Sequence, residues 1–554
     1  MPFADFDRKL KDVGRLKQIL EVLVKNELGY YVDKLKLKRF LPLSRTIEST
    51  KFIKRDTKPE RLVKVFEELD GTFIKLGQLL SIRPDLVPKE YSEAFAQLQD
   101  QVPPFPYPVA RAIVEKELGK KLKDLFENFE PSPIAAASIG QVHLAKLKDG
   151  KQVAIKVQRP RMGEILKTDI EIMYLFVYLM DKYHHPDVID PKEIVEEFED
   201  YTSKEINYLN EAKNIEAFHR NFDGDDSTKI PAVYWDHTTE KVLTIEYIKG
   251  KKLSTLLKSK KLFNRKLIAK NIVESILKQV FEHGVFHADP HPGNIIVLPN
   301  YKIAWLDFGI VGYFSEEMRE KVTDLFISIV RKDIVSLAQN LLDLGVVDKE
   351  VDIEIFKADI QKTIGKFYGA GLKDINLGEM FQEILNLSKK HSIKLPRDLI
   401  LLGKTVVTTE GVAAELDQNF NLITIATPFV EKLIKRKTSP KYIFSKVAKS
   451  AKEFKSFITD MPKQTNELLS RIKKTEKIAE QIDTDIRGLG SEIDKSSNRI
   501  ALGLLITAFL ISSALIMNVE QPKFVGIPVF SLAGFMIAFF LFFVLTVSIR
   551  REKI

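Results

Sequence analysis

Residues 285–309 place acidic and amide side chains at fixed spacing between apolar runs: VFHADPHPGNIIVLPNYKIAWLDFG. Asn294 follows Asp289 by five residues, and Asp307 follows Asn294 by thirteen. Because NIIVL, the turn PNY and KIAWL predict a tight hairpin, Asn294 and Asp307 are expected to converge where its two ends meet. Amide and carboxylate oxygens suit Mg²⁺, which proteins usually share with substrate phosphates. We therefore predict a metal site at Asn294 and Asp307, with Asp289 free to orient or deprotonate a nucleophile.

The half of the chain before this stretch supplies residues for a nucleotide. The segments GQVHLAKLK and KQVAIKVQ, joined by a D-G turn, predict a second hairpin. Lys156 on its second strand is expected to reach the phosphates of ATP, and Glu211 on the following helix is its expected ion-pair partner. The segment IEYIKG, with Glu246 and Ile248, stands where a hinge between two lobes would bind adenine through its backbone. With D-x-x-x-x-N and DFG downstream, this order of motifs resembles the protein-kinase fold.

Several positions depart from the protein-kinase pattern. The glycine-rich phosphate loop is replaced by AAASIG, and alanine methyl groups restrict how closely a backbone can approach phosphates. The residues of this loop expected to contact the nucleotide are Ala135, Ala136, Ala137, Ser138, Ile139 and Gly140. Ala288 replaces the arginine usual before the catalytic aspartate, and His291 replaces the lysine expected two residues after it. A helix-forming segment begins within ten residues of Asp307, so no A-P-E segment is present to hold a peptide substrate.

A further motif, KLGQ, lies upstream with Lys75 and Gln78 on one helix among apolar residues, so the polar pair needs partners. Together with AAASIGQVH, HADPHPGN and the apolar C-terminus, it resembles the UbiB/ADCK family of atypical kinases over about residues 60–430. The resemblance implies a kinase-like two-lobed domain whose extra N-terminal helices carry K-x-G-Q across the active site. It also implies ATP binding, and ATPase or lipid-directed kinase activity that supports isoprenoid-lipid or quinone biosynthesis at a membrane.

The motifs of that family map onto individual positions of this chain. Lys75 and Gln78 match K-x-G-Q, and the family's E-x-D motif reads E-I-N here, from Glu205 to Asn207. In the family the carboxylates of E-x-D meet the K-x-G-Q element, so Lys75 is expected to pair with Glu205. Asn207 keeps an oxygen acceptor but loses a charge, which predicts a weaker closed arrangement and a higher basal ATPase. The resemblance thus implies a catalytic group of Asp289, Lys75, Gln78 and Glu205.

The amino-acid composition and two incomplete motifs exclude several classes of function for this chain. The 554-residue chain has no cysteine, which excludes disulfides, thiolate metal sites and a cysteine nucleophile. Its net charge of +9 is spread along the chain without interleaved aromatic and basic residues, so no nucleic acid partner is expected. The segment LGKTVVT ends like a P-loop, but Asp398 stands where the first glycine belongs. His184 and His185 lack metal-ligand spacing, so no zinc site is expected.

The expected fold class is α+β: an atypical protein-kinase-like two-lobed fold with an N-terminal helical extension and a C-terminal transmembrane hairpin. Two uncharged apolar stretches near the C-terminus are each long enough to cross roughly 30 Å of hydrocarbon. Basic residues flank the pair on one side, which predicts a cell-membrane protein with its catalytic domain in the cytoplasm. The expected divisions are a basic helical region (1–59), a helical extension with KLGQ (60–130), the kinase-like domain (131–435), a charged helical stalk (436–499) and two transmembrane helices (500–517 and 524–549).

These observations favour a membrane-anchored kinase or ATPase that uses ATP and Mg²⁺. Membrane lipids, quinone or isoprenoid precursors and proteins of a biosynthetic complex are its expected partners. A true protein kinase is one alternative, against which stand the missing A-P-E segment and the overlying helices. A non-catalytic membrane scaffold with a kinase-like fold is the other. Loss of any one of four residues would favour the scaffold, and all four are intact: Lys156, Asp289, Asn294 and Asp307.

Overall fold

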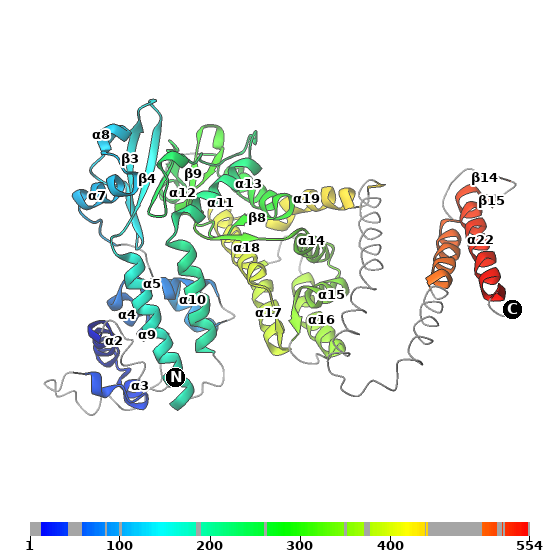
Figure 1. The fold of residues 1–554 in the computed structure, drawn as a ribbon, viewed down its shortest axis with the longest axis horizontal. Coiled ribbons are helices and arrows are strands. Elements are labelled where there is room, and N and C mark those ends of the chain that lie inside the picture. The colour runs from blue at the N-terminus through cyan, green and yellow to red at the C-terminus, as the bar shows by residue number, and fades with distance from the viewer. Residues whose placement is uncertain are drawn as a thin grey trace, which may run out of the picture. The chain divides into compact units, whose positions relative to one another are not determined.

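The chain folds into two units, Met1–Lys437 and Thr438–Ile554. The computed structural model describes residues 13–41, 58–83, 86–98, 102–183, 190–259, 263–347, 352–369, 377–437, 439–440, 501–517, 523–524 and 527–551. Residues 441–499 of the predicted stalk lie outside these ranges. The larger unit is a mixed α/β fold with a sheet lobe, a helical lobe and an N-terminal helical extension (Figure 1).

A five-stranded antiparallel sheet forms the centre of the first lobe, in the order β1-β3-β4-β6 with β2 paired to β3. Strands β3 and β4 are the predicted hairpin. Val153, Ile155 and Val157 of β4 are fully buried against α7 and α8. Because strand side chains alternate, Lys156 lies on the opposite face. The elements of this lobe are α7 (Tyr107–Leu118), α8 (Leu122–Leu125), β1 (Phe126–Phe129), β2 (Ala135–Ala136), β3 (Gly140–Leu147), β4 (Gln152–Gln158), α9 (Met162–Tyr183), α10 (Pro191–Glu205), α11 (Tyr208–Asn221) and β6 (Val242–Glu246).

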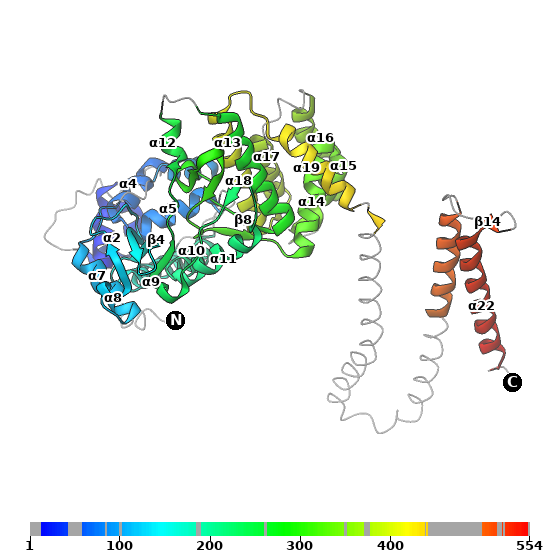
Figure 2. The same cartoon turned by 90° about the horizontal axis from the view of Figure 1, so that it is seen from above.

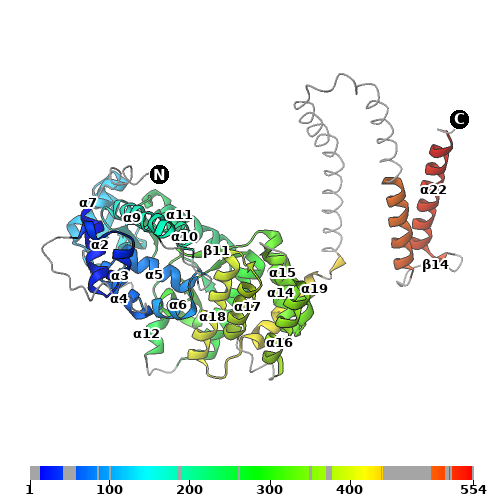
Figure 3. The same ribbon diagram turned by 90° about the horizontal axis from the view of Figure 1, so that it is seen from below.

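The N-terminal extension packs against the two long helices of the first lobe. Helix α5, which carries KLGQ, contacts α9 and α10, and Figure 3 shows the three together. The apolar positions that predict these helices are buried: Phe66, Leu69, Phe73 and Leu76. They fall on two helices, because Asp70 and Gly71 adopt positive φ between α4 and α5. The extension consists of α2 (Val13–Lys25), α3 (Gly29–Lys34), α4 (Pro59–Leu69), α5 (Thr72–Ile82) and α6 (Lys89–Phe95).

The second lobe combines two small sheets with a set of helices. One sheet has the order β5-β10-β9-β7, and β9 and β10 form the predicted hairpin with Ile295 opposite Trp305. The other pairs β8 with β11. Helix α18 lies beside α13 and α17 (Figure 2) and also contacts β11. The elements are β5 (Thr228–Lys229), β7 (Lys251–Lys252), α12 (Leu253–Leu257), α13 (Arg265–Leu277), β8 (Val285–His287), β9 (Ile295–Val297), β10 (Ile303–Trp305), β11 (Val311–Tyr313), α14 (Glu316–Arg331), α15 (Ile334–Leu344), β12 (Val346–Val347), α16 (Ile353–Gly369), α17 (Leu377–Lys390), β13 (Ile393–Lys394), α18 (Arg397–Leu416) and α19 (Leu422–Lys437).

Asp225 ties β5 of this lobe to the segment after α13. Its carboxylate accepts hydrogen bonds from the backbone of Ser227 and Thr228 and from Lys278 Nζ at 2.5 Å. Burial opposes its charge, but the hydrogen bonds from Lys278 and Ser227 outweigh burial and lower the pKa of Asp225 to about 2. A carboxyl group with a depressed pKa stabilises the folded state above its unfolded pKa, and this contribution is lost as pH falls through the folded pKa.

We predict that Asp225→Asn lowers the free energy of unfolding by about 2 kcal/mol at pH 7. Thermal melts of both proteins should differ by a constant amount down to pH 4 and converge as the pH falls toward 2. Asp149→Asn, in an exposed turn, is the control and should shift the melting temperature little, because exposed ion pairs contribute little. An equal shift for both variants would contradict the role given to Asp225.

The smaller unit contains two apolar helices joined by β14 (Lys523–Phe524) and β15 (Ile527–Pro528). Among the described residues, one helical segment, Val529–Thr546 in α22 (Val529–Arg551), is long and apolar enough to cross a membrane. The helix Ala501–Ile516 is apolar but shorter than such a span, so the prediction of two full spans is not established. The two helices pack closely, because a methyl group on Gly534 would lie 2.0 Å from Ser513 Oγ.

Candidate active site

A polar cleft of about 850 Å³ lies in the larger unit. Segments far apart in the sequence meet there, among them α5, α10, the loops around the β9–β10 hairpin and α18. The charged and amide side chains that line the cleft are Lys75, Gln78, Glu205, Lys258, Asp289, Asn294, Asp307, Lys404 and Glu415. Every residue that the sequence predicts as catalytic or metal-binding is therefore in this one cleft. Its volume is within the range of small-molecule sites.

The backbone before Asp289 is fixed by a buried histidine. His287 Nδ1 accepts a hydrogen bond from the Asp289 backbone N–H at 3.2 Å, and its Nε2 donates to the Leu306 carbonyl at 2.8 Å. These partners require the neutral tautomer with the proton on Nε2. Burial lowers the pKa of His287, which keeps the ring neutral. The ring therefore holds the Asp289 loop to the end of β10.

The β9–β10 hairpin brings Asn294 and Asp307 together, as its sequence predicts. The Leu306 backbone N–H donates to the Asn294 carbonyl at 2.8 Å. The Asn294 amide nitrogen donates to the Asp289 carbonyl at 3.1 Å and to its carboxylate at 3.3 Å, which leaves the amide oxygen available as a ligand. Asp307 adopts a positive φ of 55°, and its side chain is 54% exposed. This backbone conformation presents its carboxylate to solvent in the cleft.

Lys156 and Glu211 form the predicted ion pair, with Nζ at 2.8 Å and 3.1 Å from the two carboxylate oxygens. Asp307 Oδ1 lies 4.0 Å from the same ammonium. Burial opposes the charge on Lys156, but Asp307 and Glu211 outweigh burial and raise the pKa of Lys156. The ammonium in turn lowers the pKa of Asp307. Lys156 therefore links Glu211 on a helix of the first lobe to Asp307, the predicted metal ligand, in the second lobe.

The alanine-rich loop and the hinge lie outside the residues that line this cleft. Ala135 and Ala136 pair with β3, and the Ala137 backbone N–H donates to the Gly140 carbonyl at 2.8 Å in a tight turn. Ser138 and Ile139 are buried. Glu246 ends β6 and pairs with a lysine at 2.8 Å, and Ile248 is buried among apolar residues of β9 and β10. The nucleotide contacts predicted for these residues stay predictions.

The KLGQ helix makes its expected contact with α10. Lys75 Nζ donates to Glu205 Oε1 at 2.5 Å, and the two side chains are 4% and 20% exposed. Asn207 is used differently from the prediction. Its Oδ1 accepts the Leu209 backbone N–H at 3.0 Å and caps α11, while its side chain lines a separate hollow. Among the described contacts, the Asn207 side chain therefore serves the α11 cap and not Lys75, while its predicted effect on the closed arrangement stays a prediction.

Lys404 is the functional candidate that sequence reasoning misses. It belongs to LGKTVVT, which is rightly rejected as a P-loop because the segment lies inside α18. Its Nζ nevertheless lies 3.5 Å from Asp289 Oδ1 in the cleft. Burial lowers the pKa of Lys404, and the Asp289 carboxylate opposes that shift. The sequence signal was a single lysine in an apolar helix. His184 and His185 lie outside the described residues.

The donor set of the cleft fits Mg²⁺ shared with a nucleotide. Asn294 and Asp307 offer one neutral and one anionic oxygen ligand, whereas Mg²⁺ prefers six oxygen neighbours. Within the described residues no group of three His, Cys, Asp or Glu side chains could hold a metal alone. Phosphate oxygens and water would complete the coordination. Lys156 adds the positive charge that a polyphosphate needs.

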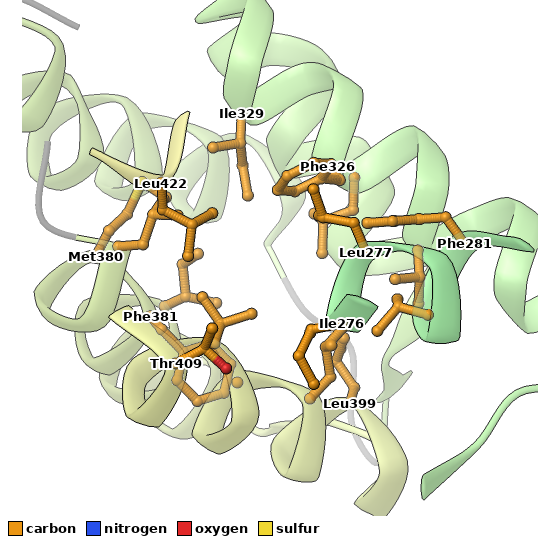
Figure 4. A pocket seen from close by; sticks show the side chains of 18 of the residues that line it. Ile276, Leu277, Phe281, Phe326, Ile329, Met380, Phe381, Leu399, Thr409 and Leu422 are labelled. Atoms are coloured by element: carbon orange, nitrogen blue, oxygen red, sulfur yellow. The ribbon is translucent and has the colours of Figure 1, made fainter. Parts of the chain in front are cut away.

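A second hollow, of about 100 Å³, lies on another face of α18 and is apolar. Figure 4 shows Ile276, Leu277, Phe281, Phe326, Ile329, Met380, Phe381, Leu399, Thr409 and Leu422 around it. Its one hydroxyl in that view, on Thr409, already donates to the Thr405 carbonyl at 2.6 Å. The hollow lacks groups that could orient phosphates, so it is not a nucleotide site.

The two lobes, the Lys156–Glu211 pair and the Asp289, Asn294 and Asp307 cluster define a kinase-like domain. Family models match the chain in three places: an ABC1 atypical kinase-like domain at residues 97–341, a UbiB helical domain at 360–421 and an ABC1/UbiB kinase-like C-terminal domain at 484–551. The chain belongs to the UbiB/ADCK family of atypical kinases.

Sequence relatives match most of this chain. An uncharacterised protein of the hydrogenase 1 5′ region in Clostridium pasteurianum is 31% identical over 98% of this chain and 99% of its own length. A probable protein kinase UbiB of Marinobacter nauticus is 32% identical over 75% of this chain and 77% of its own. The structure of Rv3197 with erythromycin from Mycobacterium tuberculosis aligns with a TM-score of 0.46 and 24% identity, covering 65% of this chain and 93% of that one.

Proposed function

We propose that this protein is an ATP- and Mg²⁺-dependent phosphotransferase or ATPase. One observation carries the proposal: the Lys156–Glu211 pair, Asp307, Asn294 and Asp289 all meet in or at one polar cleft. A non-catalytic scaffold has no functional reason to bring these charged side chains together, since burying charges costs free energy. Buried unpaired charges are strongly destabilising, and this group is paired in the way that phosphoryl transfer uses.

Each residue in or beside the cleft has a separate role in the proposed reaction. Lys156 binds the phosphates as a point charge, and Glu211 orients Lys156. Mg²⁺, held by Asn294 and Asp307, would neutralise charge on the phosphates. Asp289 accepts the proton of the attacking hydroxyl or water while that oxygen bonds to the terminal phosphorus. The bond between this phosphorus and the bridging oxygen breaks, and ADP leaves. Lys75 and Gln78 line the same cleft, which disfavours a bulky peptide as acceptor.

We further propose a membrane location with lipids, or quinone or isoprenoid precursors, as partners. The two C-terminal helices expose large apolar side chains, including Leu515 at 71% and Phe539 at 73%. Exposed apolar surface of this extent is typical of a membrane or partner contact. Close packing at Gly534 supports a helical hairpin, and basic flanking residues favour a cytoplasmic catalytic domain. The apolar hollow behind α18 would suit part of a hydrocarbon chain.

Nucleotide turnover by the full-length protein tests the proposal. The protein would be assayed in detergent and in anionic liposomes, with ATP in the presence and absence of Mg²⁺. We expect Mg²⁺-dependent release of ADP that increases in liposomes. The Lys156→Met variant should lose turnover, and the Lys151→Met variant of an exposed lysine nearby should retain it. Equal activity of these two variants would exclude the proposed active site.

A further inference from the structure

Lys404 lines the cleft but has no role in the mechanism given above. Lys404 lies on α18, 115 residues after Asp289, and its side chain is 26% exposed. The 3.5 Å between its Nζ and Asp289 Oδ1 is at the limit for a hydrogen bond. An ammonium has three N–H donors, so most of its donor capacity remains available for another acceptor in the cleft. The position of Lys404 thus suits an anionic ligand beside Asp289.

The catalytic loop has a histidine, His291, in place of a lysine. It stands two residues after Asp289, where protein kinases carry a phosphate-contacting lysine. Its Nδ1 accepts the Gly293 backbone N–H at 2.9 Å, so this nitrogen is already used in a hydrogen bond within the loop. Its Nε2 lies 3.7 Å from the Asp289 carboxylate. The catalytic loop therefore has no lysine ammonium at this position.

Contacts at the N-terminal end and in the middle of α18 fix its position beside the catalytic loop. The Tyr313 backbone N–H donates to the carboxylate of Asp398 at 3.3 Å, and Arg397 forms ion pairs with α10. Next to the lysine, Thr405 Oγ1 lies 3.4 Å from the His287 carbonyl. His287, at the end of β8, also positions Asp289. The same strand therefore fixes the positions of both Lys404 and Asp289. A helix fixed in this way can present an ammonium to a reacting phosphate with little reorganisation.

We propose that Lys404 is a catalytic residue that binds the terminal phosphate of the nucleoside triphosphate, in the role that His291 leaves unfilled. This proposal rests on the proposed function. If Asp289 takes the proton of the attacking oxygen, the terminal phosphate must lie next to Asp289. Lys404, which contacts the same carboxylate, is then within reach of that phosphate. Its charge offsets the negative charge that spreads over the phosphoryl oxygens during transfer.

Binding of two nucleotides tests this role, because ADP lacks the terminal phosphate. The full-length protein in detergent with Mg²⁺ would be titrated with ADP and with a non-hydrolysable ATP analogue. For Lys404→Met we expect the affinity for the analogue to fall about tenfold, because its terminal phosphate loses a charge-assisted hydrogen bond. The affinity for ADP, which has no terminal phosphate, should change less than about twofold. Turnover should fall roughly 10²-fold or more. Lys404→Arg should restore most of the lost affinity, and Lys390→Met, on an exposed lysine of α17, is the matched control.

Each outcome separates the two proposals. If the wild-type protein binds neither nucleotide, both the proposed function and the role of Lys404 fail. If it binds both and Lys404→Met weakens them equally, or neither, only the role of Lys404 fails. A loss of stability in Lys404→Met does not change this test, because partial unfolding weakens the apparent affinity for both nucleotides by the same factor and leaves their ratio unchanged. Lys404→Gln, which retains a polar side chain, provides a second measurement of that ratio.

Discussion

Replacing Asp307 by asparagine is expected to abolish the Mg²⁺-dependent part of nucleotide binding and to lower turnover by roughly 10³-fold, because a metal contributes several kcal/mol to charge stabilisation. The wild-type carboxylate faces the cleft and is kept ionised at neutral pH by Lys156, 4.0 Å away. Asparagine has the same shape but no charge. Together with the neutral amide of Asn294, it would leave Mg²⁺ without an anionic protein ligand.

A thermal-shift titration with nucleotide, with and without Mg²⁺, measures this effect apart from activity. Wild-type protein should be stabilised more by nucleotide with Mg²⁺ than by nucleotide alone, and Asp307→Asn should remove that difference. Lys156→Met is the informative comparison, because it should weaken nucleotide binding while preserving the dependence on Mg²⁺. If Asp307→Asn retained the full Mg²⁺-dependent stabilisation, another group would have to be the metal ligand.

The parts of the site that the sequence predicts well are those set by local geometry. A short hairpin determines that Asn294 and Asp307 meet, whatever surrounds it. Alternation along β4 likewise sends Lys156 to the face opposite the buried Val153, Ile155 and Val157. Helices α4 and α5 of the extension follow from apolar periodicity, but the turn with positive φ at Asp70 and Gly71 that separates them does not.

The parts that the sequence predicts poorly depend on tertiary packing or on competing local roles. Nothing near Lys404 indicates that α18 contacts His287 and brings the lysine to Asp289, because these contacts join segments more than a hundred residues apart. Asn207 shows the second case. An asparagine directly before a helix is a strong capping signal, and that signal explains its role better than the family motif does. Asp and Asn both cap helices, so the substitution retains the cap.

The last prediction concerns the ion pair between the KLGQ helix and α10. Lys75 is almost completely buried against Glu205, and both line the cleft. Removing one partner of a buried pair leaves the other charge uncompensated, which costs about 3–5 kcal/mol. Lys75→Met should therefore loosen α5 over the cleft and raise basal turnover several-fold. Stimulation by liposomes should shrink, because a lipid can shift only a conformational balance that is not already shifted.

Two further variants distinguish gating from simple destabilisation. In Lys75→Met/Glu205→Met no charge is left unpaired, so stability should recover toward the wild-type value while basal turnover stays high. Asn207→Asp should leave basal turnover unchanged, because aspartate accepts the same capping bond from Leu209 and lies away from Lys75. If turnover instead followed stability across the three variants, with the double variant returning to the wild-type rate, the pair would be a packing element. A high rate in the double variant together with wild-type stability would assign the KLGQ helix the role of a gate on the cleft.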